Sequence, residues 1–167
     1  MMEILDIYDD NDKLTGKTIE RYSRKLEKGE HVKASHIIIR NKKGEYLIQK
    51  RSSTKRTRPS TWDITCGAVS SGETSKVGAM REVSEEVGLN ADENDFIFIG
   101  QAMSDTGVFQ DIFFLEKDFD LSDCTMQKEE VDELKLFGKS EMLKFIDTLT
   151  HRNDAYRNII KEFISKN

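Results

Sequence analysis

Apolar and polar residues alternate over short runs in the first part of the chain, and this period of two predicts β-strands. One pair of runs covers Glu3–Tyr8 and Thr15–Ile19, separated by an acidic turn. A second pair covers Lys33–Arg40, which contains three consecutive isoleucines, and Glu45–Arg51, with the sequence Asn-Lys-Lys-Gly between them. We therefore expect two hairpins before residue 52.

The remainder of the chain combines further strand patterns with helical ones. Strands and helices in this order predict an α/β fold, an α/β/α sandwich built on a mixed β-sheet. No internal repeat or Gly/Pro-rich linker divides the sequence, so we expect one domain over residues 1–167, with a hairpin and short helix in 1–30 and helices in 140–167. The further strands expected are Trp62–Val69, Phe96–Met103, Gly107–Glu116 and Val131–Phe137, and the expected helices are Ser23–Lys28, Ser140–Leu149 and Asn153–Ser165.

Residues 67–89, GAVSSGETSKVGAMREVSEEVGL, combine a helical apolar spacing with a cluster of carboxylates. At about 100° per residue the valines fall on one side of a helix, and Glu82, Glu85 and Glu86 fall on the other. We expect the acidic side to face away from the core. Like charges four residues apart cost an isolated helix about 0.2–0.5 kcal/mol, and a divalent cation bound through carboxylate oxygens would offset that cost.

Composition excludes several classes of protein. The chain has 167 residues, a formal net charge of −5 and a pI near 5.3, so bulk attraction to nucleic acid or to a membrane surface is not expected. No apolar run approaches the length of a transmembrane helix, and the acidic N-terminus lacks the basic and apolar regions of a signal peptide. Two cysteines form neither a disulfide framework nor a metal-binding spacing. We expect a cytoplasmic protein.

The spacing of residue types in the acidic segment is more specific than its charge. The pattern G-x5-E-x7-R-E-V-x-E-E-x-G-L begins at Gly67 and ends at Leu89. It resembles the signature of the Nudix hydrolase family at every defined position. The resemblance implies the Nudix α/β/α sandwich, in which residues 67–89 form a loop–helix–loop at the edge of the sheet.

The same resemblance assigns chemistry to the signature. It makes Glu82, Glu85 and Glu86 catalytic residues and ligands of Mg²⁺ or Mn²⁺, with the backbone carbonyl of Gly67 as a further ligand. Such an assembly directs water at phosphorus and cleaves the diphosphate linkage of a nucleoside diphosphate derivative or another small organic diphosphate. The expected partner is therefore a small-molecule diphosphate.

Residues outside these ligands are expected to support them. Arg81 and Glu73 are expected to form an ion pair that braces the loop before the helix. The general base is expected to be a metal-bound glutamate or a later acid. Glu129 and Glu130 match the place where many relatives keep a later acid, and Glu130 is our candidate; the alternative is a solvated acidic turn.

A basic loop precedes the signature, and a site made of carboxylates and metal needs cations to hold an incoming diphosphate. Arg51 and Lys55 match residues that contact the diphosphate in relatives of the isomerase type, so these two are assigned to the substrate. Arg56 and Arg58 are left undecided, and the alternative for the whole loop is a solvated basic segment.

Two further stretches, LDIYDDNDKLTGKTIER and KRSSTKRTRPSTWD, resemble the subgroup similar to type 1 isopentenyl diphosphate isomerase. Cys66 matches the catalytic cysteine of that enzyme, and His31 matches a histidine of its structural metal site. Ala68 and Arg24 stand at or near positions of other histidine ligands, however, and Phe109 aligns with a metal-binding glutamate. The ligand set of the isomerase metal site is thus incomplete, while all carboxylates of the Nudix signature are present. We therefore prefer hydrolysis to isomerisation and expect Cys66 to be a small buried strand residue.

A third class is a non-catalytic Nudix domain that senses a nucleotide. Such domains usually lose a signature carboxylate, and none is missing here. Homodimers are common in the family, so a homodimer is a candidate assembly. Among other residues, His36 and Trp62 are expected to pack, and His151 is expected to lie on the surface.

Overall fold

The computed structural model describes residues 2–23 and 25–167. Within these residues a two-stranded sheet pairs β1 (Ile4–Tyr8) with β2 (Leu14–Glu20), and a larger sheet has seven strands. The strands of the larger sheet are β3 (Val32–Asn41), β4 (Tyr46–Arg51), β5 (Trp62–Asp63), β6 (Thr65–Ala68), β7 (Ile97–Met103), β8 (Val108–Lys117) and β9 (Val131–Phe137). The helices are α1 (Ser75–Glu82), the π-helical turn η1 (Val83–Val87), the 3₁₀ turns η2 (Glu93–Asp95) and η3 (Leu121–Asp123), α2 (Lys139–Thr148) and α3 (Asp154–Lys166).

The central strand β3 organises the larger sheet. It runs parallel to β8 on one edge, whereas β7 and β8 are antiparallel, so the sheet is mixed as predicted. Two strands share the other edge of β3. β6 pairs with residues 34–37 of β3, and β4 pairs only with Ile39 and Arg40. β4 then pairs with β5 and β9 instead. The sheet therefore divides into two branches beside β3, one that continues through β4 and one that consists of β6.

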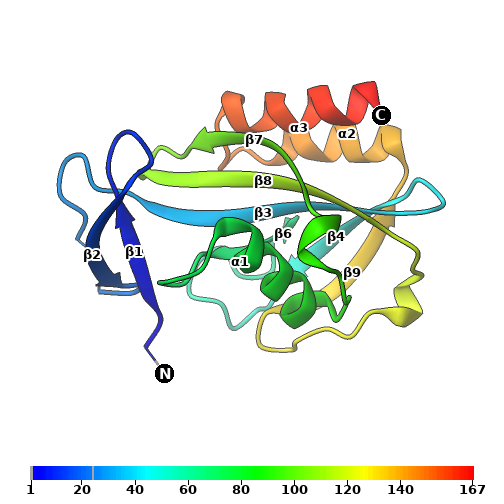
Figure 1. Cartoon of the computed structure of the whole chain (residues 1–167). Coiled ribbons are helices and arrows are strands. Elements are labelled where there is room, and N and C mark those ends of the chain that lie inside the picture. The colour runs from blue at the N-terminus through cyan, green and yellow to red at the C-terminus, as the bar shows by residue number, and fades with distance from the viewer. Residues whose placement is uncertain (1, 24) are drawn as a thin grey trace.

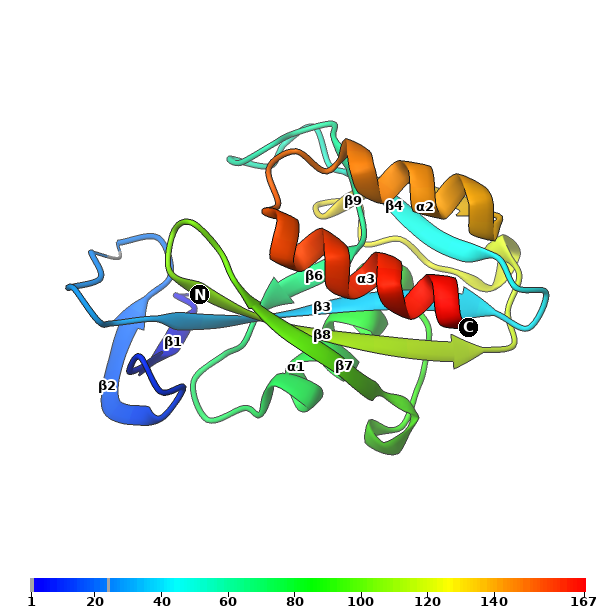
Figure 2. The ribbon, with the colours of Figure 1, turned by 90° about the horizontal axis from the view of Figure 1, so that it is seen from above.

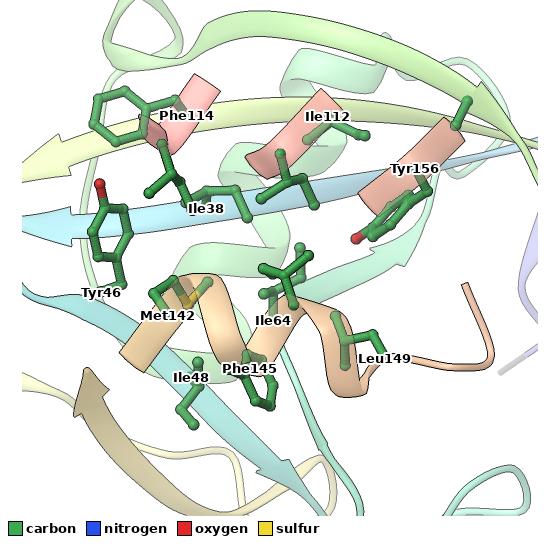
Figure 3. Packing of buried hydrophobic residues seen from close by; sticks show 14 residues of the cluster. Ile38, Tyr46, Ile48, Ile64, Ile112, Phe114, Met142, Phe145, Leu149 and Tyr156 are labelled. Atoms are coloured by element: carbon green, nitrogen blue, oxygen red, sulfur yellow. The ribbon is translucent and has the colours of Figure 1, made fainter. Parts of the chain in front are cut away.

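Helices cover both faces of this sheet, with α2 and α3 on one side and α1 on the other (Figures 1 and 2). The side chains of β3 alternate accordingly, since successive residues of a strand point to opposite faces. Ile38 packs with α2 and α3, as Figure 3 shows, while Ile37 and Ile39 pack with Val83 and Val87 beneath α1 and η1. The structure thus confirms the expected α/β/α sandwich.

Helix α3 illustrates how the sequence pattern produces this packing. Tyr156, Ile160 and Ile164 recur every four residues and are all fully buried on the sheet. The side chain of Asn153 caps the helix by accepting a hydrogen bond from the backbone nitrogen of Tyr156 at 3.1 Å. Burying each apolar side chain of this size contributes about 1.5–3 kcal/mol.

Two expected elements differ from the structure. The strand predicted over Trp62–Val69 is interrupted at Ile64, because the chain crosses there from its pairing with β4 to its pairing with β3. The helix predicted over Ser23–Lys28 is absent from Ser23 and residues 25–28, and Arg24 lies outside the described residues. A short polar segment buries too little apolar surface to stabilise a helical nucleus, which explains this error.

None of the helices in the described part of the chain is long and apolar enough to cross a membrane.

Candidate active site

The signature forms the predicted loop–helix–loop, but its helix is not regular. The side chain of Thr74 caps α1 by accepting a hydrogen bond from the backbone nitrogen of Val77 at 3.2 Å. After Glu82 the chain enters the π-helical turn η1, and Gly88 ends it with a φ of 71°. Glycine suits this left-handed position because it has no Cβ. Single π-helical turns are rare and often occur at functional sites.

The carboxylates of this helix do not share one solvent-facing side. Glu85 keeps 51% of its side chain exposed, whereas the side chain of Glu82 is only 10% exposed and Glu86 is buried. The expectation that the acidic side faces away from the core is therefore wrong for Glu82 and Glu86. Glu82 still belongs to the regular helix α1 and is buried because Gly67 of β6 lies directly against it. Glu86 lies in the π-helical turn, which shifts it around the axis relative to a wheel of constant angle.

Close contact with the sheet holds the two buried carboxylates in place. Glu82 lies directly against Gly67 of β6, where an added Cβ would come within 2.0 Å of the Glu82 carboxyl carbon. Glu86 accepts a hydrogen bond from Nε2 of Gln49 at 2.7 Å, and Oε1 of Gln49 accepts one from the hydroxyl of Thr65 at 2.8 Å. Glycine at position 67 is thus required by this close approach, apart from any role of its carbonyl.

The electrostatics of the pair favour a bound cation. Burial raises the pKa of Glu86 to about 8, and the neighbouring charge of Glu82 adds to the rise. Burial also raises the pKa of Glu82, although Arg81 opposes this effect. Two buried carboxylates that disfavour their charged forms are a donor set suited to a hard divalent cation, which would neutralise both.

Arg81 connects the loop to the helix. Its guanidinium donates to both carboxylate oxygens of Glu73, at 2.8 and 3.0 Å, so the predicted contact between these residues is present. It also donates to the carbonyl of Ala68 at 3.0 Å, to Glu82 at 2.8 Å and to Glu85 at 3.3 Å. Among the described residues no three His, Cys, Asp or Glu side chains are already grouped as a metal site, and Glu85 is instead held by Arg81.

Two cavities meet beside these carboxylates. The smaller, of about 300 Å³, is lined by Glu82, Glu85 and Glu86, and the larger has a volume of about 620 Å³. The structure therefore brings the predicted diphosphate-binding residues next to the carboxylates. The residues that line both cavities are Arg21, Arg51, Lys55, Cys66, Gly67 and Glu130.

Several of these junction residues are already in contact with one another or with neighbours. Nζ of Lys55 lies 2.5 Å from a carboxylate oxygen of Glu130. Glu129 lines only the larger cavity. Arg21 follows β2 and pairs with Glu3 at 2.6 Å. Sequence reasoning missed Arg21, because nothing in its local sequence shows that the N-terminal hairpin reaches the signature.

The residues that resemble the isomerase form ordinary structural contacts. Cys66 is partly buried in β6, and burial raises the pKa of its thiol to about 11, so it is protonated at neutral pH. His31 lies within hydrogen-bond distance of Asp10, at 2.7 Å, and of the carbonyl of Gly107, at 3.1 Å. Phe109 is buried, and its ring lies 5.1 Å from that of His31. Cys66 is thus less enclosed than expected, and its thiol is a poor nucleophile.

A charged network behind the larger cavity was also missed. Buried Asp63 accepts hydrogen bonds from Arg58 and Arg152, each at 2.9 Å, and lies 3.3 Å from Nε2 of His151. His151 is exposed as expected, yet it lines the cavity. His36 is buried and bonded to the hydroxyl of Tyr156 at 2.9 Å, which confirms its expected packing role. Asp63 and Arg152 are 89 positions apart, so no local pattern could pair them.

Fold and site together define a class of protein. A split mixed sheet, an acidic loop–helix–loop at its edge and a cationic cavity beside that loop are the features of a Nudix-type hydrolase, an enzyme that acts on diphosphate bonds. The family model of the NUDIX domain matches residues 29–162. The chain therefore belongs to the Nudix family.

Individual relatives agree with this assignment. A Nudix hydrolase of Listeria monocytogenes is 41% identical over 142 residues, which cover 84% of this chain and 83% of the relative. An isopentenyl-diphosphate Delta-isomerase of Corynebacterium diphtheriae is 36% identical over 61 residues, or 36% of this chain and 33% of the relative. A crystal structure of a Deinococcus radiodurans protein shares the fold with a TM-score of 0.75, 21% identity and 98% coverage of both chains. The likeness to the isomerase is thus confined to part of the chain.

Proposed function

We propose that this chain is a divalent-metal-dependent hydrolase that cleaves the diphosphate linkage of a nucleoside diphosphate derivative or another small organic diphosphate by attack of water at phosphorus. One observation carries the proposal. The buried carboxylates of Glu82 and Glu86 line the small cavity together with the cationic residues Arg51 and Lys55, which also line the larger cavity. Opposite charges placed side by side in this way suit a metal ion on one side and phosphate oxygens on the other.

The metal is proposed to be Mg²⁺ or Mn²⁺, held by Glu82, Glu85, Glu86 and the carbonyl of Gly67. When bound, it supplies positive charge to the phosphate oxygens and acidifies water. Arg81 and Glu73 act from outside this set. Their bidentate contact, with the bond from Arg81 to the carbonyl of Ala68, fixes the end of β6 and the loop after it against the helix that carries Glu82. The donor set is complete only when Glu85 leaves Arg81 and turns toward the other two carboxylates.

The diphosphate is proposed to lie against Arg51 and Lys55. Among the described residues the guanidinium of Arg51 donates only to the carbonyl of Thr57, at 3.1 and 3.3 Å, and keeps further donors for a phosphate. Lys55 holds the carboxylate of Glu130 at the edge of the small cavity. Glu130 is the proposed general base, or a metal-bound glutamate takes this role.

The proposal takes residues 1–167 as one domain, since the N-terminal hairpin contributes Arg21 to both cavities. It also places the enzyme in the cytoplasm, and a homodimer is its candidate assembly. Measuring the mass in solution by light scattering tests the assembly independently of activity.

The test is a broad panel of nucleotide and isoprenoid diphosphates, incubated with Mg²⁺ or Mn²⁺ and analysed for products by mass spectrometry. We expect hydrolysis that requires the metal and is abolished by Glu85→Gln or Glu86→Gln. Turnover that survives both substitutions would overturn the assigned role of the helix. Rearrangement of isopentenyl diphosphate that is lost on Cys66→Ser would instead support an isomerase. Binding without any turnover would support a nucleotide sensor.

A further inference from the structure

The larger cavity adjoins the small one along β6. Gly67 lies against Glu82, and Cys66 and Gly67 line both cavities, whereas Ala68 lines only the larger one. The two cavities therefore join at Cys66 and Gly67. Under the proposed function, on which this inference rests, the diphosphate occupies this junction and its substituent fills the larger cavity.

The walls of the larger cavity carry far more positive than negative charge. Glu129 and Glu130 are its carboxylates among the described lining residues, and Glu130 is already paired with Lys55. Arg56 lies over the ring of Tyr22, which leaves its charge unneutralised. The cationic lining residues are Arg21, Lys33, Arg51, Lys55, Arg56, Arg58 and Arg152.

Arg152 is the most confined of these cations. Its side chain is only 9% exposed, and Nη2 donates to Asp63 at 2.9 Å and lies 3.7 Å from the sulfur of Cys66. Its Nε is buried and has no hydrogen-bond partner among the described residues. A buried donor of a charged group is costly to leave unpaired, and Arg152 lines the larger cavity, where its guanidinium can meet an anionic ligand.

Asp63 does not cancel the charge of this region. It is buried behind the cavity wall and is shared by Arg58 and Arg152, so that two guanidinium groups depend on a single carboxylate. His151 adds a third donor to the same oxygen. The carboxylate therefore orients the two arginines, and their net positive charge remains available to a ligand.

We propose that Arg152, positioned by Asp63 beside Cys66, binds a second anionic group of the substrate. The preferred substrates are then organic diphosphates that carry a further phosphate outside the linkage that is cleaved. Guanidinium groups bind phosphate oxygens in pairs of parallel hydrogen bonds, which suits this set of donors. The glutamates of the small cavity determine the reaction, and Arg152 determines which diphosphates are preferred.

Matched substrate pairs that differ by one phosphate test the proposal. NADPH and NADH form one such pair, coenzyme A and dephospho-coenzyme A a second, and ATP and ADP a third. In at least one pair we expect kcat/KM to favour the additional phosphate by about ten- to a hundredfold, the effect of one charged hydrogen bond. Arg152→Met is expected to bring this ratio close to one, and Arg152→Lys to restore part of it.

Arg157→Met is the matched control, because Arg157 lies in the first part of α3, just after Arg152, is paired with Asp154 and is not among the cavity residues. The Arg157→Met variant should keep the wild-type ratio of kcat/KM between the two members of each pair. Equal kcat/KM within every pair, or a ratio that Arg152→Met leaves at the value of the control, would refute the proposal. Arg152→Met could fail to fold because Asp63 loses a partner. In that case the double variant Asp63→Asn/Arg152→Met, which removes both charges, is used in place of the single variant.

A binding measurement separates this proposal from the proposed function. The affinity of Glu85→Gln protein for both members of each pair, measured by calorimetry with Mg²⁺, is expected to show the same preference without turnover. Preferential binding in the absence of any hydrolysis would refute the hydrolase and retain the anionic subsite. Hydrolysis by the wild-type protein, together with equal binding of both members of each pair, would retain the hydrolase and refute the anionic subsite.

Discussion

The small and the large cavity share six lining residues but differ in charge and in origin. Among the described residues, five carboxylates and four cations line the small cavity, whereas seven cations and two carboxylates line the large one. The small cavity takes its acidic groups mainly from one helix and its continuation. The large cavity collects side chains from the N-terminal hairpin, the loop after β4, strands β3 and β8, and the α2–α3 connection.

This difference separates reaction from recognition. Metal-assisted chemistry needs a few oxygens at fixed spacing, and a single helical segment can hold them. Recognition of a whole substrate needs contacts over several hundred cubic ångströms, which several segments must supply together. Variants of the small cavity should therefore affect turnover, while variants of the large cavity should affect the fold or the choice of substrate.

The largest effect is expected when a carboxylate of the small cavity is removed. Glu86→Gln keeps the shape of the side chain and its hydrogen bond with Gln49 but loses a proposed metal ligand. We expect kcat/KM to fall by roughly a thousandfold, or about 4 kcal/mol of transition-state stabilisation, while the protein stays folded. Steady-state kinetics with circular dichroism test this, and exposed Glu162→Gln is the control. A loss below about tenfold would argue against a catalytic role for Glu86.

Behind the wall of the large cavity, the strongest effect is expected on stability. Asp63→Asn leaves Arg58 and Arg152 without their carboxylate, which should lower the free energy of unfolding by about 3–5 kcal/mol at neutral pH. Denaturation in urea provides the measurement. Asp154→Asn, at an exposed ion pair, should change stability by less than about 1 kcal/mol.

The same variant has a defined pH dependence. Burial opposes the charged form of Asp63, but the hydrogen bond from His151 and the charges of Arg152 and Arg58 outweigh it and lower its pKa below the ordinary 3.8. A carboxylate with a depressed pKa stabilises the fold above its unfolded pKa, and this contribution is lost as the pH falls toward the folded value. The stability difference between wild type and Asp63→Asn should therefore shrink below about pH 4. A difference that stays constant down to pH 2 would contradict the burial of an ionised Asp63.

Gly67→Ala tests the boundary between the cavities. The added methyl group would lie 2.0 Å from the Glu82 carboxyl carbon and must displace that side chain. We expect kcat/KM to fall about a hundredfold, since a displacement of about 1 Å at a catalytic group has an effect of this size. Gly138→Ala is the matched control, because its nearest contact would be an ordinary 3.6 Å. Kinetics that are equal in the two variants would show that Glu82 has room to move.

The smallest effect is expected at Arg21, which lines both cavities. Arg21→Met should raise KM for the diphosphate about tenfold with little change in kcat, because it removes a contact made equally in the ground and transition states. Measuring kcat and KM separately checks this split. A fall in kcat with unchanged KM would instead assign Arg21 to the reaction itself.

The fold was largely predictable because each strand and helix carries its own periodicity. The isoleucines of β3 and the four-residue spacing in α3 indicate burial locally, and the structure confirms both elements. The errors occur where local pattern and tertiary contact disagree. Ile64 lies within the predicted strand but sits where the chain changes its pairing partner, and Ser23 and residues 25–28 are too polar to bury a helical face.

The sequence by itself determined the family and the identity of the acidic residues, because the spacing of a signature within one helix is a property of neighbouring positions. Only the tertiary structure decided that Glu82 and Glu86 are buried and that Arg152 meets Asp63 from 89 positions away. Burial and ion pairing depend on which distant segments pack against a side chain. That packing is the combined result of all apolar faces in the chain, and no single stretch of sequence contains it.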